Sequence, residues 1–375
     1  MRILISAGEA SGDLYAARLV TTLRQRFPQA QFFGCAGPRM QAAGVKPIVD
    51  SRSLAVVGIV EVVAHLPRIL GELRKLTRAI HAERPDFAIL TDSPDFHLRL
   101  AKRLHRAGVP VVYLVAPQAW AWREGRVRTM RKTICRLLCI FPFEWEFFTG
   151  RGVPTTFIGH PLAGTVKPAM TRAEFSARFG IAKDSRIVTL LPGSRHGEAA
   201  RHIPVLIEAG RRIRARHPVR LVMALPPGFG FETSTFKERV ADASIQVVEG
   251  YTWDVLAQSE LALAASGTVT IEAALLGIPM VTFYRVNALS WILGRWLVRA
   301  PFLCMVNLVA GRRVVPELIQ RDMTAEGIAD EALRLLDDPA RRAAMQADLA
   351  EVAGRLRTER DPMEIAAESI LEVVK

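Results

Sequence analysis

Short runs of hydrophobic, often β-branched residues alternate along the chain with longer stretches whose hydrophobic residues recur at spacings of three and four. The short runs indicate buried strands, and stretches such as Leu14–Phe27 and Ile69–His81 indicate amphipathic helices. The expected strands are Ile3–Ser6, Gln31–Gly34, Phe87–Thr91, Val111–Val115, Leu137–Ile140, Thr156–Ile158, Ile187–Leu191, Leu221–Ala224, Ile245–Val248, Leu261–Ala264 and Met280–Phe283. Strands that alternate with helices form parallel sheets covered on both faces, so the pattern predicts an α/β fold.

This strand pattern has one interruption. It stops after Ile158 and resumes at Ile187, and Pro161 and Pro168 break any helix between them. The chain has 375 residues, whereas a single hydrophobic core stops growing at about 250–300 residues. We therefore expect two Rossmann-like domains that face a cleft, over residues 1–166 and 167–345. Helices over residues 346–375 are expected to pack back on the first domain or on a partner subunit.

The charge balance narrows the expected partners. Lys and Arg outnumber Asp and Glu by 50 to 37, and this formal surplus of +13 favours phosphates, nucleic acid or an acidic membrane surface. The four cysteines lack the paired spacing of a zinc site and fit a reducing cytosol. The uncharged run Gly108–Trp122 is shorter than the roughly 18–20 residues of a spanning helix, and the first residues do not resemble a signal peptide. We expect a cytoplasmic protein that does not cross a membrane.

The first expected strand leads into the turn Gly8-Glu9-Ala10-Ser11-Gly12-Asp13, and we expect a helix to start at Asp13. Open α/β sheets bind ligands at the carboxyl ends of their strands, where helix N-termini offer backbone N–H groups to a phosphate. The two glycines do not form the G-x-G-x-x-G pattern of a dinucleotide site, and taken alone they fit a tight turn better. Gly8, Glu9, Ser11 and Gly12 are therefore candidate substrate-binding residues.

Two turns of the second domain have the same arrangement. Leu191-Pro-Gly193-Ser194-Arg195 ends a strand with a Gly-Ser turn and an arginine suited to a phosphate, although a capped helix with a solvated arginine gives the same pattern. Ser266-Gly267-Thr268 opens an apolar helix, and Glu272 could reach a pair of ribose hydroxyls; the alternative is an N-cap with a first-turn acid. Three strand-end turns that suit one phosphorylated ligand favour the functional interpretation.

The segment Asp92-Ser-Pro-Asp95-Phe96 follows the strand Phe87–Thr91, so both carboxylates are expected near the carboxyl edge of the first sheet. Either could act as a general base, and a helix N-cap explains either residue equally well. The spacing is not the Asp-x-Asp that holds a divalent ion against a nucleotide diphosphate, so we expect no metal and no cofactor. The nucleotide signals lie in the second domain, so the turn after the first strand is expected beside Asp92, where its glycines allow close backbone approach.

The segment Ile59–Ile80 carries hydrophobic residues at spacings of three and four beside Arg68, Arg74, Lys75 and Arg78. An interfacial helix on an anionic membrane has this composition, but periodicity alone favours a core-facing helix. The basic stretch between Trp120 and Arg136 has no aromatic residues interleaved beyond its first turn, so we expect no nucleic-acid partner.

Ten short motifs follow one another from the first strand to the second half of the chain. They are Gly8-Glu-Ala-Ser-Gly-Asp13, Ala36-Gly-Pro-Arg-Met40, Val57-Gly-Ile-Val-Glu61, Asp92-Ser-Pro-Asp-Phe96, Ala119-Trp-Ala-Trp122, Phe141-Pro-Phe-Glu144, Gly159-His160, Leu191-Pro-Gly-Ser-Arg195, Ser266-Gly-Thr268 and Asn307-Leu-Val-Ala-Gly-Arg312. Taken together, these motifs resemble the lipid-A-disaccharide synthase family, and the resemblance continues to the final helices.

The resemblance implies an inverting glycosyltransferase of the GT-B type. The family joins UDP-2,3-diacylglucosamine to 2,3-diacylglucosamine 1-phosphate, known as lipid X, in lipid A and lipopolysaccharide biosynthesis of Gram-negative bacteria. The products are a β(1→6) disaccharide 1-phosphate and UDP. By position, Asp92 matches the family's essential carboxylate, Arg195 its essential arginine and Asn307 its essential asparagine. Ser266-Gly-Thr268 and Glu272 match the uridine-diphosphate end of the site.

The resemblance also implies a membrane surface, because Val56–Leu70 matches the hydrophobic patch through which the family sits on the inner leaflet, at the cytoplasmic face. The expected membrane-contact residues are Val60, Val62, Val63, Leu66, Ile69 and Leu70. Pro67 interrupts the helical pattern, so we expect a turn followed by a helix that starts near Pro67. Family members also form dimers with exchanged C-terminal segments, so a homodimer through the C-terminal region is a further expected partner.

Two other interpretations fit part of the pattern. Another two-domain enzyme of UDP-N-acetylglucosamine, such as the peptidoglycan transferase or the 2-epimerase, would use a soluble donor without acyl chains. A non-catalytic basic protein that binds membrane or RNA would explain the charge. It would leave the paired strand-end turns without a purpose.

Overall fold

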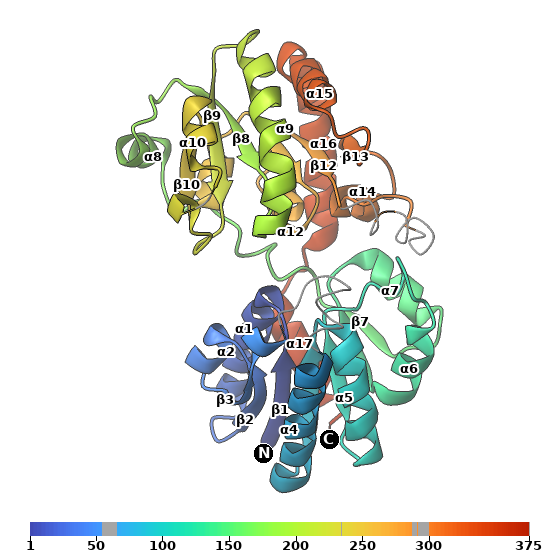
Figure 1. Cartoon of the computed structure of the whole chain (residues 1–375). Helices are drawn as coiled ribbons and strands as arrows, with labels where there is room; N and C mark the ends of the chain where they lie inside the picture. Colours follow the sequence, from blue (N-terminus) through green and yellow to red (C-terminus); the bar gives the residue numbers. More distant parts are fainter. Residues whose placement is uncertain (55–65, 234, 287–290, 292–299, 375) are drawn as a thin grey trace. The chain divides into compact units, whose positions relative to one another are not determined.

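The computed structural model describes residues 1–54, 66–233, 235–286, 291 and 300–374, and the chain divides into two compact units (Figure 1). Unit 1 comprises Met1–Pro161 and Leu356–Lys375, and unit 2 comprises Leu162–Arg355. The expected boundary at residue 166 lies just inside unit 2. Unit 1 is therefore built from both ends of the sequence.

Unit 1 is a parallel sheet of seven described strands in the order β3-β2-β1-β4-β5-β6-β7. Its strands are β1 (Arg2–Ala7), β2 (Gln31–Ala36), β3 (Lys46–Asp50), β4 (Phe87–Thr91), β5 (Val111–Leu114), β6 (Arg136–Cys139) and β7 (Thr155–Phe157). Its helices are α1 (Ala10–Arg26), α2 (Pro38–Ala42), α4 (Leu66–Glu83), α5 (Pro94–Arg106), α6 (Arg126–Thr133), α7 (Pro142–Thr149) and α17 (Pro362–Leu371), with a short 3-10 helix over Ser51–Ser53. Helix α1 packs against α2 and α17, and α5 packs against α4 and α6.

Unit 2 is a parallel sheet of six described strands in the order β10-β9-β8-β11-β12-β13. Its strands are β8 (Arg186–Leu191), β9 (Val219–Leu225), β10 (Gln246–Glu249), β11 (Leu261–Ala265), β12 (Met280–Tyr284) and β13 (Glu317–Ile319). Its helices are α8 (Arg172–Phe179), α9 (His196–Arg214), α10 (Lys237–Asp242), α11 (Thr252–Ala257), α12 (Thr268–Leu275), α14 (Met305–Ala310), α15 (Ala325–Asp337) and α16 (Pro339–Leu356), with a 3-10 helix over Phe231–Thr233. Helix α9 packs against α15, and α12 packs against α14.

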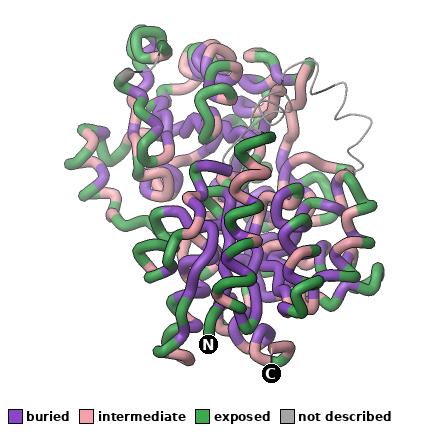
Figure 2. The backbone as a smooth tube through the Cα atoms, turned by 60° about the horizontal axis from the view of Figure 1, so that its bottom comes forward, coloured by how far each residue is buried: buried purple, intermediate pink, exposed green. Residues whose placement is uncertain are grey.

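The strands form the buried centre of each unit, as the purple tube in Figure 2 shows. Every residue of β4 and of β11 is buried. Strands that are buried on both faces have continuous hydrophobic sequences, which is why the hydrophobic pattern locates the central strands. The two parallel α/β units confirm the expected Rossmann-like fold class.

In each sheet the strand order reverses between two neighbours, which are β1 and β4 in unit 1 and β8 and β11 in unit 2. Open α/β sheets bind ligands at the carboxyl ends of such a strand pair. Gly8 and Asp92 directly follow β1 and β4, whereas Pro192 and Ser266 directly follow β8 and β11. The predicted turns of each unit therefore meet at the switch point of their own sheet.

Two edge strands and one helix start differ from the expected pattern. Strand β3 begins with Lys46-Pro47, and β13 has three residues and starts at Glu317, so neither has a hydrophobic run long enough to be recognised. Both lie at the end of their sheet, where proline and polar residues are tolerated. Helix α1 begins at Ala10 rather than at the expected Asp13, because the N–H of Asp13 already bonds to the Glu9 carbonyl at 2.9 Å.

The final helix, α17, completes unit 1 by packing on α1. Ala366, Ala367 and Ile370 are fully buried there. Arg26 of α1 forms ion pairs with Glu364 and Glu368 of α17. Apolar burial and charge pairing together fix the end of the chain to the helix that follows the first strand.

Candidate active site

Asp92 lies at the carboxyl end of β4, at the switch point of unit 1. Its carboxylate accepts hydrogen bonds from the Gly8 N–H at 2.8 Å and from the Glu9 N–H at 3.0 Å. The turn after β1 therefore binds the carboxylate that follows the neighbouring strand. The Asp92 side chain is 12% exposed, so it is largely desolvated but still open to a ligand.

The backbone of Asp92 is held in an unusual conformation. Asp92 and Ser93 have φ angles of +54° and +36°, in a region that residues other than glycine rarely adopt. The Asp92 carbonyl accepts hydrogen bonds from the Tyr113 hydroxyl and from His97 Nδ1, the latter at 3.0 Å. His97 Nε2 lies 2.7 Å from the Ser6 hydroxyl, and both His97 and Tyr113 are fully buried. These buried groups fix the direction of the carboxylate.

Burial also sets the protonation of this cluster. Burial raises the pKa of Asp92 to about 7, with a further rise from the charge of Glu9, while the Gly8 N–H opposes the shift. Burial lowers the pKa of His97 to about 4, so its imidazole is neutral at pH 7. A general base works best when its pKa lies near the working pH. Asp92 has this property.

Asp95 has a different environment, because it is exposed in the first turn of α5 and paired with two arginines. Arg123 Nη1 donates to both Asp95 oxygens at 2.9 and 3.0 Å, and Arg126 Nη2 donates to Oδ1 at 2.6 Å. Both guanidinium groups lie over the Trp122 ring, at 4.5 and 4.7 Å from its centroid. Of the two candidate carboxylates, Asp92 is the one shielded from solvent.

The glycines of the first turn are required by the close approach of Asp92. A Cβ on Gly12 would lie 1.7 Å from Asp92 Oδ2, and a Cβ on Gly8 would lie 3.1 Å from Asp92 Oδ1. Glu9 and Ser11 are exposed on the same turn. The structure therefore brings Gly8, Glu9 and Gly12 to Asp92, and for Ser11 it shows an exposed side chain on the same turn.

The second unit places an arginine at its own switch point. Gly193 has a φ of +110°, and a Cβ on it would lie 2.8 Å from Glu198 Oε2. Arg195 is the N-cap residue of α9, and its side chain is 52% exposed and reaches Glu198 Oε1 at 3.4 Å. Ser194 is exposed beside it. An exposed guanidinium with one long ion-pair contact is free to bind an anionic group.

His202 of α9 holds this turn against the end of β12. Its Nδ1 lies 2.7 Å from the Pro192 carbonyl, and its Nε2 accepts a hydrogen bond from the Arg285 N–H at 3.2 Å. Burial lowers the pKa of the imidazole. The neutral tautomer with its proton on Nδ1 satisfies both contacts.

The turn after β11 leads into α12, with Gly267 as the N-cap residue and Thr268 as the first helical residue. Both are exposed, so the positive end of the helix faces solvent. Glu272, one turn later, accepts a hydrogen bond from Trp253 Nε1 at 2.7 Å, and burial raises its pKa. The Ser266 hydroxyl donates to the Leu303 carbonyl at 3.0 Å.

Asn307 is fully buried, unlike the other predicted catalytic residues. Its Oδ1 accepts hydrogen bonds from the N–H groups of Val314 and Val315, at 2.7 and 2.9 Å. Its Nδ2 donates to the Val315 carbonyl at 2.9 Å and to Glu317 Oε1 at 2.6 Å. These four bonds use the full capacity of the amide. In this conformation no polar atom of the Asn307 side chain is left for a substrate.

The predicted membrane-contact residues are only partly described. Val60, Val62 and Val63 lie outside the described residues. Helix α4 begins at Leu66, next to Pro67, and Leu66 is 41% exposed. The last two members of the set, Ile69 and Leu70, are half-buried on the same helix.

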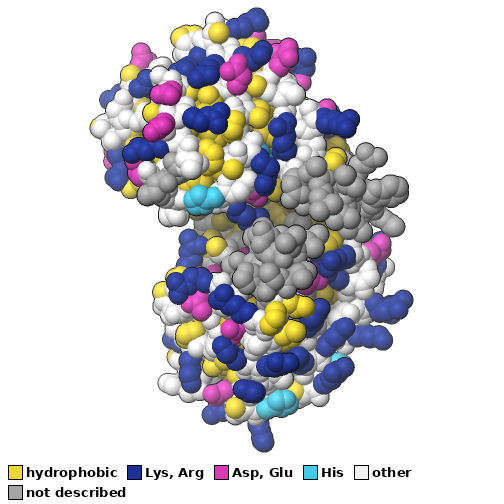
Figure 3. Space-filling view, viewed as in Figure 1, with side chains coloured by type: hydrophobic (Ala, Val, Ile, Leu, Met, Phe, Trp, Pro, Cys, Tyr) yellow, Lys and Arg dark blue, Asp and Glu magenta, His cyan; other side chains and the backbone are white. Residues whose placement is uncertain are grey.

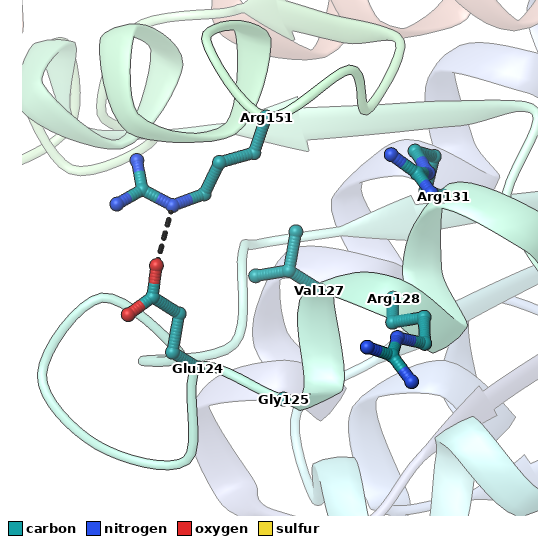
Figure 4. A pocket seen from close by; sticks show the side chains of 6 residues that line it. All are labelled: Glu124, Gly125, Val127, Arg128, Arg131 and Arg151. Atoms are coloured by element: carbon teal, nitrogen blue, oxygen red, sulfur yellow. Dashed lines mark hydrogen bonds and ion pairs between the residues drawn. The ribbon is translucent and has the colours of Figure 1, made fainter.

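A hollow of about 560 Å³ lies at the start of α6 (Figure 4). The side chains around it are Glu124, Gly125, Val127, Arg128, Arg131 and Arg151. Arg151 Nε donates to Glu124 Oε1 at 2.8 Å, and Figure 4 shows these two side chains pointing toward one another. None of the predicted site residues lines this hollow, so it is separate from the candidate active site.

Across the described parts of the chain, no three His, Cys, Asp or Glu side chains are grouped so as to hold a metal ion. No helix in these parts has the length and hydropathy needed to cross a membrane. Unit 1 offers carboxylates to a ligand, and unit 2 offers a guanidinium group and the N–H groups of a helix start.

The residues of these clusters that were not predicted from the sequence include His97, Tyr113, His202 and Glu317. A single histidine on a helix or a tyrosine within a buried strand forms no pattern of its own. Glu317 lies in a strand too short to be recognised. Their partners lie on other elements or turns, so only the folded chain shows what they do.

Comparison with known proteins gives consistent matches along the whole chain. A family model described as lipid-A-disaccharide synthetase matches residues 3–370. A lipid-A-disaccharide synthase from Solibacter usitatus is 59% identical over 374 residues, which covers 100% of this chain and 98% of the relative. A second protein with that name, from Myxococcus xanthus, is 44% identical over 374 residues, with 100% and 97% covered.

Solved structures with low sequence identity share the fold. The UDP-GlcNAc 2-epimerase from Neisseria meningitidis, bound to UDP-GlcNAc, has a TM-score of 0.65 at 13% identity, with 99% of this chain and 100% of that chain covered. The calicheamicin glycosyltransferase has a TM-score of 0.59 at 16% identity, with 100% and 98% covered. At such identities the likeness concerns the fold alone.

Proposed function

This chain belongs to the lipid-A-disaccharide synthetase family, and from that premise we propose that it joins UDP-2,3-diacylglucosamine to 2,3-diacylglucosamine 1-phosphate. It is a hexosyltransferase of lipid A disaccharide synthesis, and its products under this proposal are the β(1→6) disaccharide 1-phosphate and UDP. Such a transfer needs one group that accepts a proton and others that stabilise the leaving diphosphate. The observation that carries the proposal is the buried Asp92 carboxylate, whose pKa is about 7, at the switch point of unit 1.

We assign proton removal to Asp92. In an inverting transfer the acceptor hydroxyl oxygen attacks the anomeric carbon while the bond from that carbon to the UDP oxygen breaks on the opposite face. The hydroxyl proton passes to the Asp92 carboxylate, which the N–H groups of Gly8 and Glu9 hold in place. The exposed Glu9, Ser11 and Asp95 side chains are assigned to the acceptor sugar.

We assign stabilisation of the leaving group to unit 2. UDP leaves with an additional negative charge on its diphosphate. Arg195 supplies a full positive charge, and the start of α12 supplies backbone N–H groups and the positive end of the helix dipole. Gly193 and Ser194 allow the diphosphate to approach the backbone, and Glu272 is assigned to the ribose hydroxyls. Removing one preorganised group of this kind typically costs about 2.7–4 kcal/mol of transition-state stabilisation.

The proposal is tested by mass spectrometry of the products formed from UDP-2,3-diacylglucosamine and 2,3-diacylglucosamine 1-phosphate. We expect a diacylglucosamine disaccharide monophosphate and one equivalent of UDP. No product with pure enzyme and detergent-dispersed substrates would contradict the proposal. Consumption of UDP-N-acetylglucosamine in a parallel reaction would favour a soluble-donor enzyme instead.

We further propose that unit 1 binds an anionic membrane surface at α4. Leu66 is exposed at the start of this helix, and Arg68, Arg74, Lys75 and Arg78 are exposed along it. Figure 3 shows hydrophobic and basic side chains together on the face of unit 1 that carries α4. Both substrates carry acyl chains, and at about 0.8 kcal/mol per buried CH₂ they do not leave a bilayer freely. An enzyme that docks to the bilayer reaches them there.

Vesicle binding tests the membrane proposal. We expect that Leu66→Ser, alone and combined with serine at Val60 and Val62, lowers the fraction of protein that sediments with phosphatidylglycerol vesicles and leaves UDP affinity unchanged. Trp145→Ser is a matched control, because Trp145 is 44% exposed on a different helix, α7. Loss of UDP binding in the Leu66 variant would indicate a core role for this segment.

Two finer assignments follow from the family. We propose that the enzyme works at the cytoplasmic face of the inner membrane. Cell fractionation at low salt should then recover the enzyme with the washed membranes.

We also propose a homodimer through the C-terminal region. Light scattering coupled to size exclusion would contradict the dimer if the full chain remained a monomer at micromolar concentration.

A further inference from the structure

Glu317 begins the edge strand β13, and its two carboxylate oxygens bind different parts of unit 2. Oε1 accepts a hydrogen bond from Asn307 Nδ2 at 2.6 Å, and Oε2 accepts one from the Leu303 N–H at 2.9 Å. The side chain is half-buried. The carboxylate therefore ties α14, which contains Asn307, to the segment that precedes α14.

Leu303 continues this connection to the start of α12. Its carbonyl accepts a hydrogen bond from the Ser266 hydroxyl at 3.0 Å. The Ser266 N–H in turn donates to the Phe283 carbonyl at 2.9 Å, and α12 packs directly on α14. A continuous chain of three hydrogen bonds thus leads from the buried Asn307 amide to the Ser266 turn.

Glu317 is the charged member of this chain, and hydrogen bonds to a carboxylate are shorter and stronger than neutral ones. Asn307 cannot follow a displaced carboxylate, because its other three hydrogen bonds fix it to Val314 and Val315. Loss of the carboxylate therefore removes the acceptor of the Leu303 N–H and loosens the residue whose carbonyl binds the Ser266 hydroxyl.

We propose that Glu317 is a positioning residue for the UDP-sugar site. It sets the Leu303 carbonyl, and through that carbonyl the Ser266 hydroxyl and the exposed helix start at Gly267 and Thr268. It does not touch the ligand. Asn307 acts through the same carboxylate, which gives a fully buried amide a role in the reaction. The inference rests on the proposed function, in which the α12 start holds the diphosphate.

Glu317→Gln tests the inference in the full-length enzyme. Glutamine keeps the size of the side chain but turns one acceptor into an NH₂ group that faces an N–H donor. We expect the dissociation constant of UDP, measured by calorimetry, and the KM of the donor sugar to rise about five- to twentyfold. The acceptor KM should stay within about twofold, which a general loss of folding would not allow.

Two further variants separate positioning from a local structural effect. Ser266→Ala removes the last bond of the chain, so its combination with Glu317→Gln should weaken UDP binding no more than the worse single variant does. Asp338→Asn is the matched control, because Asp338 accepts the Arg341 N–H at 2.9 Å at the start of α16, in the same unit. It should leave UDP affinity unchanged.

The outcomes distinguish this inference from the function on which it rests. If wild-type protein neither binds UDP nor forms the disaccharide, the proposed function fails. If wild-type protein binds UDP and Glu317→Gln binds it equally well, the positioning role alone is overturned. A double variant whose loss equals the product of the two single losses would also overturn it, because independent sites multiply their effects.

Discussion

At the scale of single residues, Asp92 shows a conflict between stability and function. Its folded-state pKa of about 7 lies above the ordinary value of 3.8, so the folded protein binds this proton more tightly than the unfolded chain. The contribution of Asp92 to stability is therefore greatest below about pH 4 and is lost as the pH rises toward 7. A charged carboxylate is more stable in water, and residues other than glycine rarely adopt a positive φ. Asp92 is nevertheless held in this place and conformation, because His97 and Tyr113 donate hydrogen bonds to its carbonyl.

Asp92→Asn should lower kcat by about 100-fold or more, because an amide cannot accept the hydroxyl proton. UDP affinity should be unchanged, since the nucleotide is assigned to unit 2. The measurements are steady-state turnover and calorimetry with UDP, with a thermal scan to confirm folding. Asp95→Asn is the matched comparison and should lose less than about tenfold, because its carboxylate is exposed and paired with arginines. Near-normal turnover by Asp92→Asn would remove Asp92 as the base.

The pH dependence of the reaction follows from the same residue. A base must be ionised to accept a proton, so kcat/KM should rise about tenfold per pH unit below 7 and level off above it. His97, whose pKa is about 4, stays neutral over this range and should add no second step. Initial rates at low substrate concentration between pH 5 and 9 test this expectation. A kcat/KM that is already level from pH 5 upward would show that Asp92 titrates as an ordinary exposed carboxylate.

At the scale of elements, the first turn of α1 is shaped to accept the side chain that follows β4. Gly12→Ala should lower turnover roughly 100-fold, because the new Cβ would lie 1.7 Å from Asp92 Oδ2 and push the carboxylate from its place. Gly71→Ala is the matched control, since a Cβ on Gly71 of α4 would meet no atom within 4 Å. It should stabilise the helix by about 0.5–1 kcal/mol without loss of turnover. Equal activity of the two variants would contradict the close-approach argument.

The sequence predicts best the strands that lie in the hydrophobic core. Strands β4 and β11 are buried along their whole length, so their hydrophobic runs are complete in the sequence. Strands β3 and β13 are paired on one side, and their proline and glutamate break the pattern. Helix α1 starts early because of a backbone contact rather than a capping side chain.

The candidate site also has parts that the sequence predicts and parts that it does not. Asp92, Arg195 and Ser266 can be found in the sequence because each lies in the turn that follows a hydrophobic strand. Asn307 was found only through the resemblance to a family. The positive φ of Asp92 and the buried groups that support it depend on contacts such as the His97–Ser6 pair, which joins residues far apart in the chain. Local patterns carry no information about such contacts.

At the scale of the whole molecule, unit 1 depends on α17. Ile370→Ala should lower the free energy of unfolding of unit 1 by about 2–4 kcal/mol, because this side chain is fully buried. Ile365→Ala, on the same helix but half-buried, should lower it less. Hydrogen exchange resolved to single strands is the measurement, and unit 2 should keep its protection. An equal loss in both units would show that α17 supports more than unit 1.

The return of the chain to unit 1 also has a consequence for synthesis on the ribosome. Residues 1–161 emerge first, but the helix that covers α1 emerges last, after all of unit 2. Unit 2 is continuous in sequence and has every strand available before α17 is made. Domains generally fold in the order in which they emerge. Here we expect the unit that is started first to be finished last, with its nascent sheet waiting through the translation of nearly two hundred residues.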